Sequence, residues 1–346
     1  MFGWMGERIV DERLAELMAL LRPDARPNVH RLRQIANAIE PLSLNIKQLG
    51  YGLADQMAAA LPPRENTEAR GVGLPNSLST QAAIESDWAA HWCAELGIPV
   101  MFDRKIWESS FMLQVLHERD HLRSGARGLG FGCGTEALTS YLAARGVSVT
   151  ATDQAPDAAR RGGWTKSGQY TGSADQAFMP HLIDRATFDR QVEIRHVDMN
   201  DVPADLQNYD FCWSVCALEY LGSIEKGLRF VENSLATLRP GGLAVHTTEF
   251  NIRDDGPTID NWPRVAFQRR HVDKMVARLR SKGHKIATFD YSLGTGPLDR
   301  FIDLPPFPHE MPETMAAWIG PQPHLKVALD GMIVTSIGFA VEKASN

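Results

Sequence analysis

The chain has 346 residues, of which 44% are hydrophobic and 23% charged, and its formal net charge is −6. This composition is typical of a globular protein with one or two domains, and the negative charge gives a nucleic-acid partner no electrostatic support. Because no apolar run approaches the roughly 18 residues that span a bilayer and the N-terminus turns charged too early for a signal peptide, we predict a cytoplasmic protein with no membrane partner.

The first hundred residues are rich in helical patterns. Apolar residues recur at helical spacing before Pro23 and again before Pro41, and a further helix is expected from Ile46 to Leu61. None of these segments carries a recognisable chemical motif. We therefore predict an N-terminal helical region, residues 1–103, that serves as a cap or lid, as a dimer contact or as part of the core.

A possible metal motif follows this region. The segment from His117 to His121 reads HERDH and matches the zinc-binding pattern HExxH. It lies in the predicted charged last turn of a helix, however, and Ser124 and Arg127 stand where an extended zinc motif would have glycine and histidine. The four cysteines contain no CxxC pair. We therefore predict neither a bound metal nor a disulfide.

The next segment has the pattern of a strand, a tight turn, a helix and a second strand. A short apolar run, Leu129 to Phe131, is followed by a glycine turn, Gly132 to Gly134, and by apolar residues at helical spacing. A second strand of alternating residues ends on Asp153. Such units bind nucleotides, because glycines let the backbone approach a ligand closely and an acid at the strand tip accepts hydrogen bonds from a ribose diol.

The rest of the chain alternates between helical segments and strands. An acid, Asp198, follows the third strand, and RPGG at 239–242 indicates a turn before the fifth. A Pro-rich insertion, 297–323, precedes the last strand. The predicted strands after Asp153 cover residues 192–196, 209–215, 243–250, 285–291 and 331–341.

Four motifs occur in this order: GFGCGTE together with Asp153, then VDMNDVP, YDFCWSVCALEYL and LRPGGLAVHTTEFN. Over roughly residues 104–346 they resemble the motifs of the class I S-adenosylmethionine-dependent methyltransferases. The resemblance implies an α/β fold, namely a doubly wound, Rossmann-like, seven-stranded methyltransferase sheet that follows the N-terminal helical cap. It also implies a methyltransferase with S-adenosyl-L-methionine as its cofactor.

The resemblance also implies a cofactor site. The glycine turn would hold the methionine end of the cofactor, Asp153 the ribose and Asp198 the adenine. Gly130 departs from the family, which usually has an acid there, and Glu136 stands in place of a third glycine, so Glu219 or a backbone carbonyl would have to meet the cofactor's ammonium. The residues expected to bind the cofactor are Gly130, Gly132, Cys133, Gly134, Asp153, Gln154, Asp198, Met199, Ser214 and Glu219.

The predicted catalytic position is the end of the fifth strand, because ligands of an open α/β sheet lie beyond the carboxyl ends of its strands. On a regular strand Glu249 and Asn251 point to one face and His246 to the other. We predict that Glu249 is a general base or orients the acceptor, with burial raising its pKa, and the alternative is a structural salt bridge. Tyr220 and Trp107 are predicted to contact the substrate.

The predicted acceptor is a small molecule or a saccharide. The overall pattern resembles bacterial methyltransferases associated with sugars and natural products, which favours a saccharide hydroxyl over an aromatic or lipid acceptor. Two alternatives stay open. Gly132, Gly134 and Ala137 also satisfy the GxGxxG/A fingerprint of an NAD-dependent oxidoreductase, and a catalytically silent S-adenosylmethionine-binding regulator would carry a blocked pocket. A homodimer is also left open.

Overall fold

The computed structural model describes residues 15, 18–62 and 68–345. Most of the first predicted helical stripe, which precedes Pro23, lies outside the described residues. The described chain forms two compact units. The smaller unit holds the residues up to Gly50 together with Leu304–Ile319, and the larger unit holds Tyr51–Asp303 and the residues from Gly320 onward.

Most of helix α2 (Val29–Ala59) belongs to the smaller unit. The predicted helix end before Pro41 is not found, because the helix continues through this residue. A proline inside a helix removes one backbone hydrogen bond. Farther along the helix Lys47 is buried, and its Nζ atom lies 4.8 Å from the centre of the ring of Phe307, in the segment Leu304–Ile319.

The larger unit is built around one sheet of eleven strands. The strands are β1 (Asn76–Leu78), β2 (Arg127–Phe131), β3 (Ser148–Asp153), β4 (Val192–His196), β5 (Tyr209–Val215), β6 (Leu238–Asn251), β7 (Lys285–Ile286), β8 (Phe289–Asp290), β9 (Ile302–Asp303), β10 (Lys326–Leu329) and β11 (Met332–Glu342). Their main order is β4-β3-β2-β5-β6-β11-β1-β8. The first five strands of this order are parallel and β11 is antiparallel to β6, which confirms the predicted fold class.

The sheet differs from the seven predicted strands in local details. The sixth predicted strand is divided into β7 and β8, and β1, β9 and β10 are too short for their side chains to show a clear alternation. The RPGG segment lies inside β6, not before it. There Gly241 has a φ of 72° and the pairing between β5 and β6 shifts register, so the turn signal marks an irregularity within a strand.

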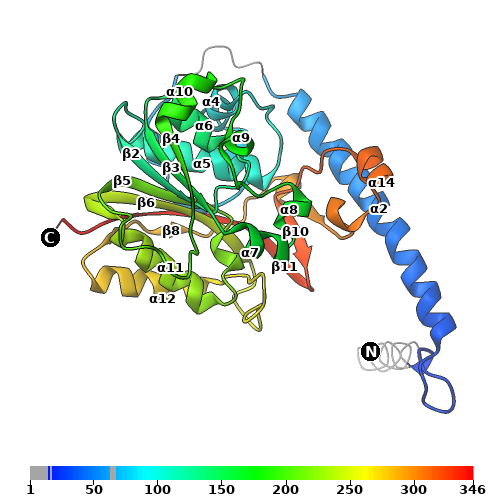
Figure 1. Cartoon of the computed structure of the whole chain (residues 1–346). Coiled ribbons are helices and arrows are strands. Elements are labelled where there is room, and N and C mark those ends of the chain that lie inside the picture. Colours follow the sequence, from blue (N-terminus) through cyan, green and yellow to red (C-terminus); the bar gives the residue numbers. More distant parts are fainter. Residues whose placement is uncertain (1–14, 16–17, 63–67, 346) are drawn as a thin grey trace. The chain divides into compact units, whose positions relative to one another are not determined.

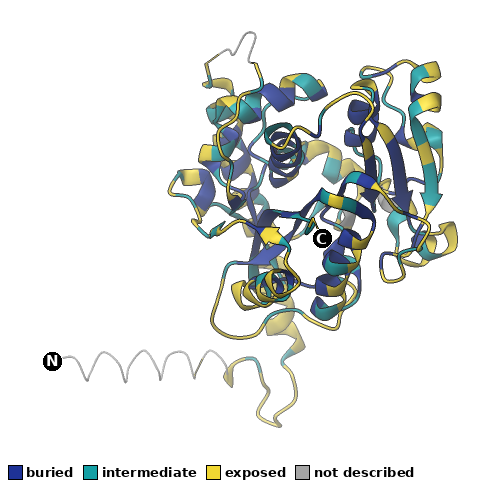
Figure 2. Ribbon diagram, turned by 90° about the vertical axis from the view of Figure 1, so that its left-hand side faces the viewer, coloured by how far each residue is buried: buried dark blue, intermediate teal, exposed yellow. Residues whose placement is uncertain are grey.

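Helices cover both faces of the sheet (Figure 1). One face is covered by α4 (Asp87–Leu96), α5 (Arg104–Glu118), α6 (Leu138–Ala144) and α10 (Arg185–Gln191), and the other by α11 (Ile224–Ala236) and α12 (Arg269–Ser281). The short helix α3 (Gln81–Ile84) packs against α4 and α5. Along β5 the side chains alternate between these layers, with Phe211 and Trp213 in the first core and Cys212 in the second. Figure 2 shows most of the sheet in the dark blue of buried residues.

The HExxH match at His117–His121, from which we predict no metal site, does not have the geometry of a zinc-binding helix. Helix α5 ends at Glu118, and Asp120 has a φ of 57°, so His121 lies beyond the helix that carries His117. The two histidines therefore do not share one helical face. The structure contains four free cysteines, all of them buried, among the residues it describes.

The predicted boundary between residues 103 and 104 lies within the larger unit. β1 pairs with β11, and Trp92 of α4 is part of the core beside α5, so these segments pack with the sheet. The role of residues 1–103 as a cap stays a prediction. Within the described part of the chain, the helices fall short of the length and apolar character needed to cross a membrane.

Candidate functional site

A cavity of about 480 Å³ opens beyond the carboxyl ends of β2, β3 and β5. Open parallel sheets bind their ligands at this edge, and the volume lies within the usual range for small-molecule sites. The cavity brings together most of the cofactor residues that the sequence predicts. These are Gly132, Cys133, Gly134, Asp153, Gln154, Asp198 and Met199.

The glycine turn after β2 lines the cavity with its backbone. Gly132 has a φ of 59° and Gly134 a φ of 54°, a region in which residues with a side chain are strained. A Cβ atom at Gly132 would lie 2.8 Å from the Ala217 Cβ atom, and one at Gly134 would lie 2.7 Å from the Gln169 carbonyl oxygen. The backbone conformation of the turn and the close neighbouring atoms therefore both require glycine at these two positions.

Asp153 ends β3 with its carboxylate held by backbone N–H groups. Its Oδ1 atom accepts a hydrogen bond from Gln154 at 2.8 Å, and its Oδ2 atom accepts bonds from Thr171 at 3.1 Å and Gly134 at 3.3 Å. Burial raises the pKa of Asp153, and these backbone hydrogen bonds oppose the rise. Since a carboxylate offers about four acceptor positions, one position remains for a ligand.

Three predicted cofactor residues do not line the cavity. Gly130 lies under the turn, where an added Cβ atom would come within 2.3 Å of the Cys133 Sγ atom, so an acid cannot fit there. The Ser214 hydroxyl shares a 2.8 Å hydrogen bond with His246. Glu219 is fully buried and accepts a 3.0 Å hydrogen bond from Thr248, and burial together with the charge of Glu249 raises its pKa to about 7.

The two predicted substrate residues differ in their placement. Tyr220 lines the cavity, where its ring meets that of Trp164 edge-to-face with the centres 4.6 Å apart. Trp107 is buried and stacks on Phe111 with the ring centres 5.0 Å apart. Trp107 is therefore a core residue here, because its apolar ring lies on the face of α5 that packs in the core.

Glu249, the predicted general base, is buried outside the cavity lining. It accepts a 2.9 Å hydrogen bond from Arg104 and a 2.6 Å hydrogen bond from Arg264 Nε. Burial alone would raise the pKa of Glu249, but the charge of Arg104 and the hydrogen bond and charge of Arg264 lower it. The predicted rise in this pKa is therefore wrong, and the geometry matches the salt-bridge alternative.

The other two predicted catalytic residues are also buried and paired. His246 lies between the hydroxyls of Ser214 and Ser234, at 2.8 and 3.2 Å, and burial lowers its pKa to about 3. The Asn251 side chain donates to Thr258 at 3.3 Å. Both residues belong to β6. They form hydrogen bonds within the protein and are absent from the cavity lining.

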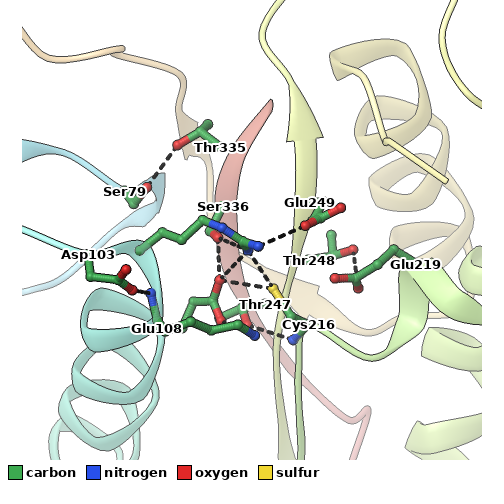
Figure 3. A network of polar contacts seen from close by, with 12 residues as sticks. Ser79, Asp103, Glu108, Cys216, Glu219, Thr247, Thr248, Glu249, Thr335 and Ser336 are labelled. Atoms are coloured by element: carbon green, nitrogen blue, oxygen red, sulfur yellow. Dashed lines mark hydrogen bonds and ion pairs between the residues drawn. The ribbon is translucent and has the colours of Figure 1, made fainter. Parts of the chain in front are cut away.

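Behind the cavity lies a buried polar network (Figure 3). Figure 3 shows Glu108, Cys216, Ser336 and Glu249 gathered between α5 and the strands β6 and β11. Arg104 connects them, with Nη1 lying 3.2 Å from Glu108 Oε1 and 3.3 Å from both Cys216 Sγ and Ser336 Oγ. The network fixes α5 on the sheet and places the next residue, Lys105, at the cavity.

Two charged cavity residues were not assigned a role from the sequence. Lys105 has its Nζ atom 3.1 Å from Glu108 Oε2, and Glu136 follows the glycine turn. Burial raises the pKa of Glu136 to about 7, the Lys105 charge opposes the rise and the Glu108 charge adds to it. The sequence signal for Glu136 was its place where the family has a glycine, but nothing in the sequence pointed to Lys105.

The family model for a methyltransferase domain matches residues 107–288, which is more than half of the chain. The chain belongs to this family of methyltransferase domains. The match confirms the resemblance to class I S-adenosylmethionine-dependent methyltransferases, and S-adenosyl-L-methionine is the cofactor. No curated protein matches the chain significantly.

The chain is also similar to several solved structures, at low sequence identity. A candidate sarcosine dimethylglycine methyltransferase from Galdieria sulphuraria is 14% identical, with 75% of this chain and 99% of that chain covered and a TM-score of 0.41. Magnesium protoporphyrin IX methyltransferase from Synechocystis PCC 6803 is 11% identical, with 69% and 79% covered and a TM-score of 0.39. The [4+2]-cyclase SpnF is 16% identical, with 79% and 99% covered and a TM-score of 0.40.

The donor set of this methyltransferase's cavity suits the cofactor. Asp153 and Asp198 offer carboxylates for hydroxyl and amino groups, and Lys105 offers a cation for the carboxylate of the methionine end. The Asp198 carboxylate is already ordered, since it accepts a 2.8 Å hydrogen bond from the Asn200 backbone. Within the described residues the methyltransferase has no group of three or more His, Cys, Asp or Glu side chains arranged for a metal ion.

Proposed function

We propose that the protein methylates a hydroxyl group of a small molecule, and that a saccharide or a natural product is the acceptor. The single observation that carries this proposal is the placement of a titratable carboxyl, Glu136, in the same cavity as the residues of the glycine turn, Asp153 and Asp198. The saccharide part of the proposal rests on the resemblance in sequence alone.

Under this proposal one group of cavity residues binds the cofactor, and a second group contacts the acceptor. The glycine turn would hold the methionine end of the cofactor, Asp153 its ribose, and Asp198 its adenine. When bound, S-adenosyl-L-methionine supplies a methyl group on a positively charged sulfur. The chain's contribution is then to align the acceptor with that group, and positioning of this kind accounts for much of the rate of a bimolecular reaction.

A hydroxyl acceptor needs a group that takes its proton. Glu136 suits this role because a general base works best when its pKa is near the working pH, and burial raises the pKa of Glu136 to about 7. Tyr220 and Trp164 present aromatic surface to the same cavity. Sugar rings and small aromatic compounds both pack on such surfaces, so this pair would support either acceptor.

The proposal can be tested with methyl-labelled cofactor and fractionated extracts rich in neutral saccharides, in phenolic compounds or in amines. We expect label on an oxygen of a saccharide or natural product, and we expect none with an Asp153→Ala control, which removes the ribose acceptor. Label on nitrogen or carbon would contradict the hydroxyl class. Tight cofactor binding without label in any fraction would instead favour the silent regulator. NAD binding tighter than S-adenosyl-L-methionine binding would favour the oxidoreductase.

A further inference from the structure

Helix α2 carries a regular row of exposed aliphatic side chains. Within the smaller unit these residues are separated alternately by three and four positions and are each between 40% and 77% exposed. We refer to this row as the α2 seam. It consists of Leu32, Ile35, Ile39, Leu42, Ile46 and Leu49.

The α2 seam is distinct from the side of the helix that packs within its own unit. Ser43, Lys47 and Gly50 are buried, and Lys47 lies over Phe307. The helix therefore already has one packed side, and the exposed apolar seam lies directly beside it, since the buried Ser43 and Gly50 follow the exposed Leu42 and Leu49. Pro41 lies on neither of these sides, and the helix continues through it.

The spacing of the α2 seam indicates the shape of its partner. An alternation of three and four is the heptad pattern of two helices that wind around each other, with the seam at positions a and d. A membrane surface would suit a broader apolar stripe with basic flanks. Here two residues directly beside the seam are the small Ala36 and Ala38, and the charged Arg33 and Glu40 lie farther around the helix.

The composition of the α2 seam suits an identical partner. In the second and third heptads Ile39 and Ile46 occupy position a and Leu42 and Leu49 occupy position d, the combination that favours parallel two-stranded coiled coils, whereas Leu32 and Ile35 of the first heptad have the reverse order. Because the seam is uncharged, two copies do not repel each other. Twelve aliphatic side chains in a pair would remove on the order of 1,000 Å² from water, near the lower limit for a specific interface.

We propose that the α2 seam pairs with the α2 seam of a second copy of this chain in a parallel, in-register coiled coil. This proposal does not depend on the acceptor or on the catalytic residues. It makes α2 a self-association element, and residues 29–50 a dimer contact. In such a pair each Leu42 lies opposite the Leu42 of the other copy, because residues at position d face each other in a parallel coiled coil.

The first test is the mass of the full-length protein by sedimentation equilibrium over nanomolar to micromolar concentrations. We expect a dimer of twice 38.4 kDa. Leu42→Glu with Ile46→Glu should raise the dissociation constant at least 100-fold, because four buried carboxylates would face each other. Asn37→Glu with Gln48→Glu is the matched control, since it adds the same charge to the same helix outside the seam, and its mass should stay dimeric.

Unchanged cofactor affinity and circular dichroism in both variants would show that folding is retained. A parent protein that is monomeric at all concentrations would overturn the proposal. Binding of the seam to a lipid vesicle, or to the residues that precede Pro23, would in that case replace self-association. A dimer that resists the seam substitutions would overturn it as well.

The second test concerns orientation. We expect Leu49→Cys, at one end of the seam, to form an intermolecular disulfide under mild oxidation, whereas Gln48→Cys outside the seam should form much less. The four native cysteines are buried, so their contribution to cross-linking should be small. Efficient cross-linking of Leu49→Cys only with Leu32→Cys of the other copy would indicate an antiparallel pair and would overturn the parallel arrangement.

Discussion

Arg104 and Glu249 form a buried ion pair, with 2.9 Å between Arg104 Nη2 and Glu249 Oε1, although 145 residues separate them in the chain. The pair joins helix α5 to strand β6. Its exposed fractions are 10% for the arginine side chain and 1% for the glutamate side chain. Breaking one half of such a pair leaves the other charge buried, which costs far more than losing a surface ion pair.

We therefore expect Arg104→Met to lower the free energy of unfolding by about 3–5 kcal/mol, the usual loss when one partner of a buried pair is removed. Urea denaturation followed by circular dichroism would measure it. Arg264→Met is the matched comparison and should cost less, because the Arg264 side chain is 26% exposed. A loss below 1 kcal/mol for Arg104→Met would mean that the network does not stabilise the fold.

The same carboxylate should give the stability a specific pH dependence. The pKa of Glu249 is lowered in the folded state, so its contribution is complete above the pKa of the unfolded chain and is lost as the pH falls through the folded-state value. The stability difference between the parent and Glu249→Gln should therefore be constant near neutral pH and shrink below about pH 4. Denaturation curves at several pH values test this, and a difference that grows with acid would contradict it.

The elements around the cavity could be predicted because their signals are local. Gly132 and Gly134 show the turn directly in the sequence, and the alternating residues before Asp153 show the strand. Strand β1 could not be predicted, since three residues carry no periodicity and its pairing with β11 joins distant segments. The sequence therefore predicts the sheet edge that binds a ligand but not the short strands at its far side.

The environment of each side chain could be predicted only in part. Strand alternation places Glu249 and His246 on opposite faces, and the structure agrees, because Glu249 bonds Arg104 of α5 whereas His246 packs against Phe230 of α11. What lies opposite each side chain depends on distant residues. Nothing near Glu249 in the sequence indicated that Arg104 would neutralise it.

The Asp153 carboxylate should control cofactor affinity. Asp153→Ala is expected to weaken binding of S-adenosyl-L-methionine by about 1.5–3 kcal/mol for each charge-assisted hydrogen bond lost, or roughly 10–150-fold. Ser214→Ala is the control, because Ser214 bonds His246 and does not line the cavity. Calorimetry would measure both, and equal losses in the two variants would contradict the cavity as the cofactor site.

Gly130 should be intolerant of any side chain for reasons of packing. A Cβ atom there would lie 2.3 Å from Cys133 Sγ and 2.4 Å from Trp213 Cζ2. We expect Gly130→Ala to destabilise the protein by about 1–3 kcal/mol, as overpacked cores do. Gly52→Ala, in α2 with open space around it, should be neutral or slightly stabilising. Thermal unfolding that ranks the two variants the other way would contradict this.

Glu136 should carry the proton transfer. Glu136→Gln keeps the size of the side chain and removes the base, so we expect kcat to fall by about 10²–10⁴-fold while the cofactor dissociation constant changes little. A base acts when it is deprotonated. In the parent, kcat/KM should therefore rise with pH and level off above about 7, the pKa of Glu136, and Glu136→Gln should lack this rise.

The Lys105 charge lowers the pKa of Glu136, so Lys105→Met should move the rise in kcat/KM to higher pH. This shift separates a base from a residue that only fills space, which would show no pH dependence of its own. A parallel loss of cofactor affinity in Glu136→Gln would instead place the carboxylate beside the cofactor's ammonium, in the role of the acid that cannot fit at Gly130, and would remove Glu136 as the base. Unchanged kcat together with unchanged cofactor affinity in Glu136→Gln would contradict both roles, because each requires a negative charge that glutamine lacks.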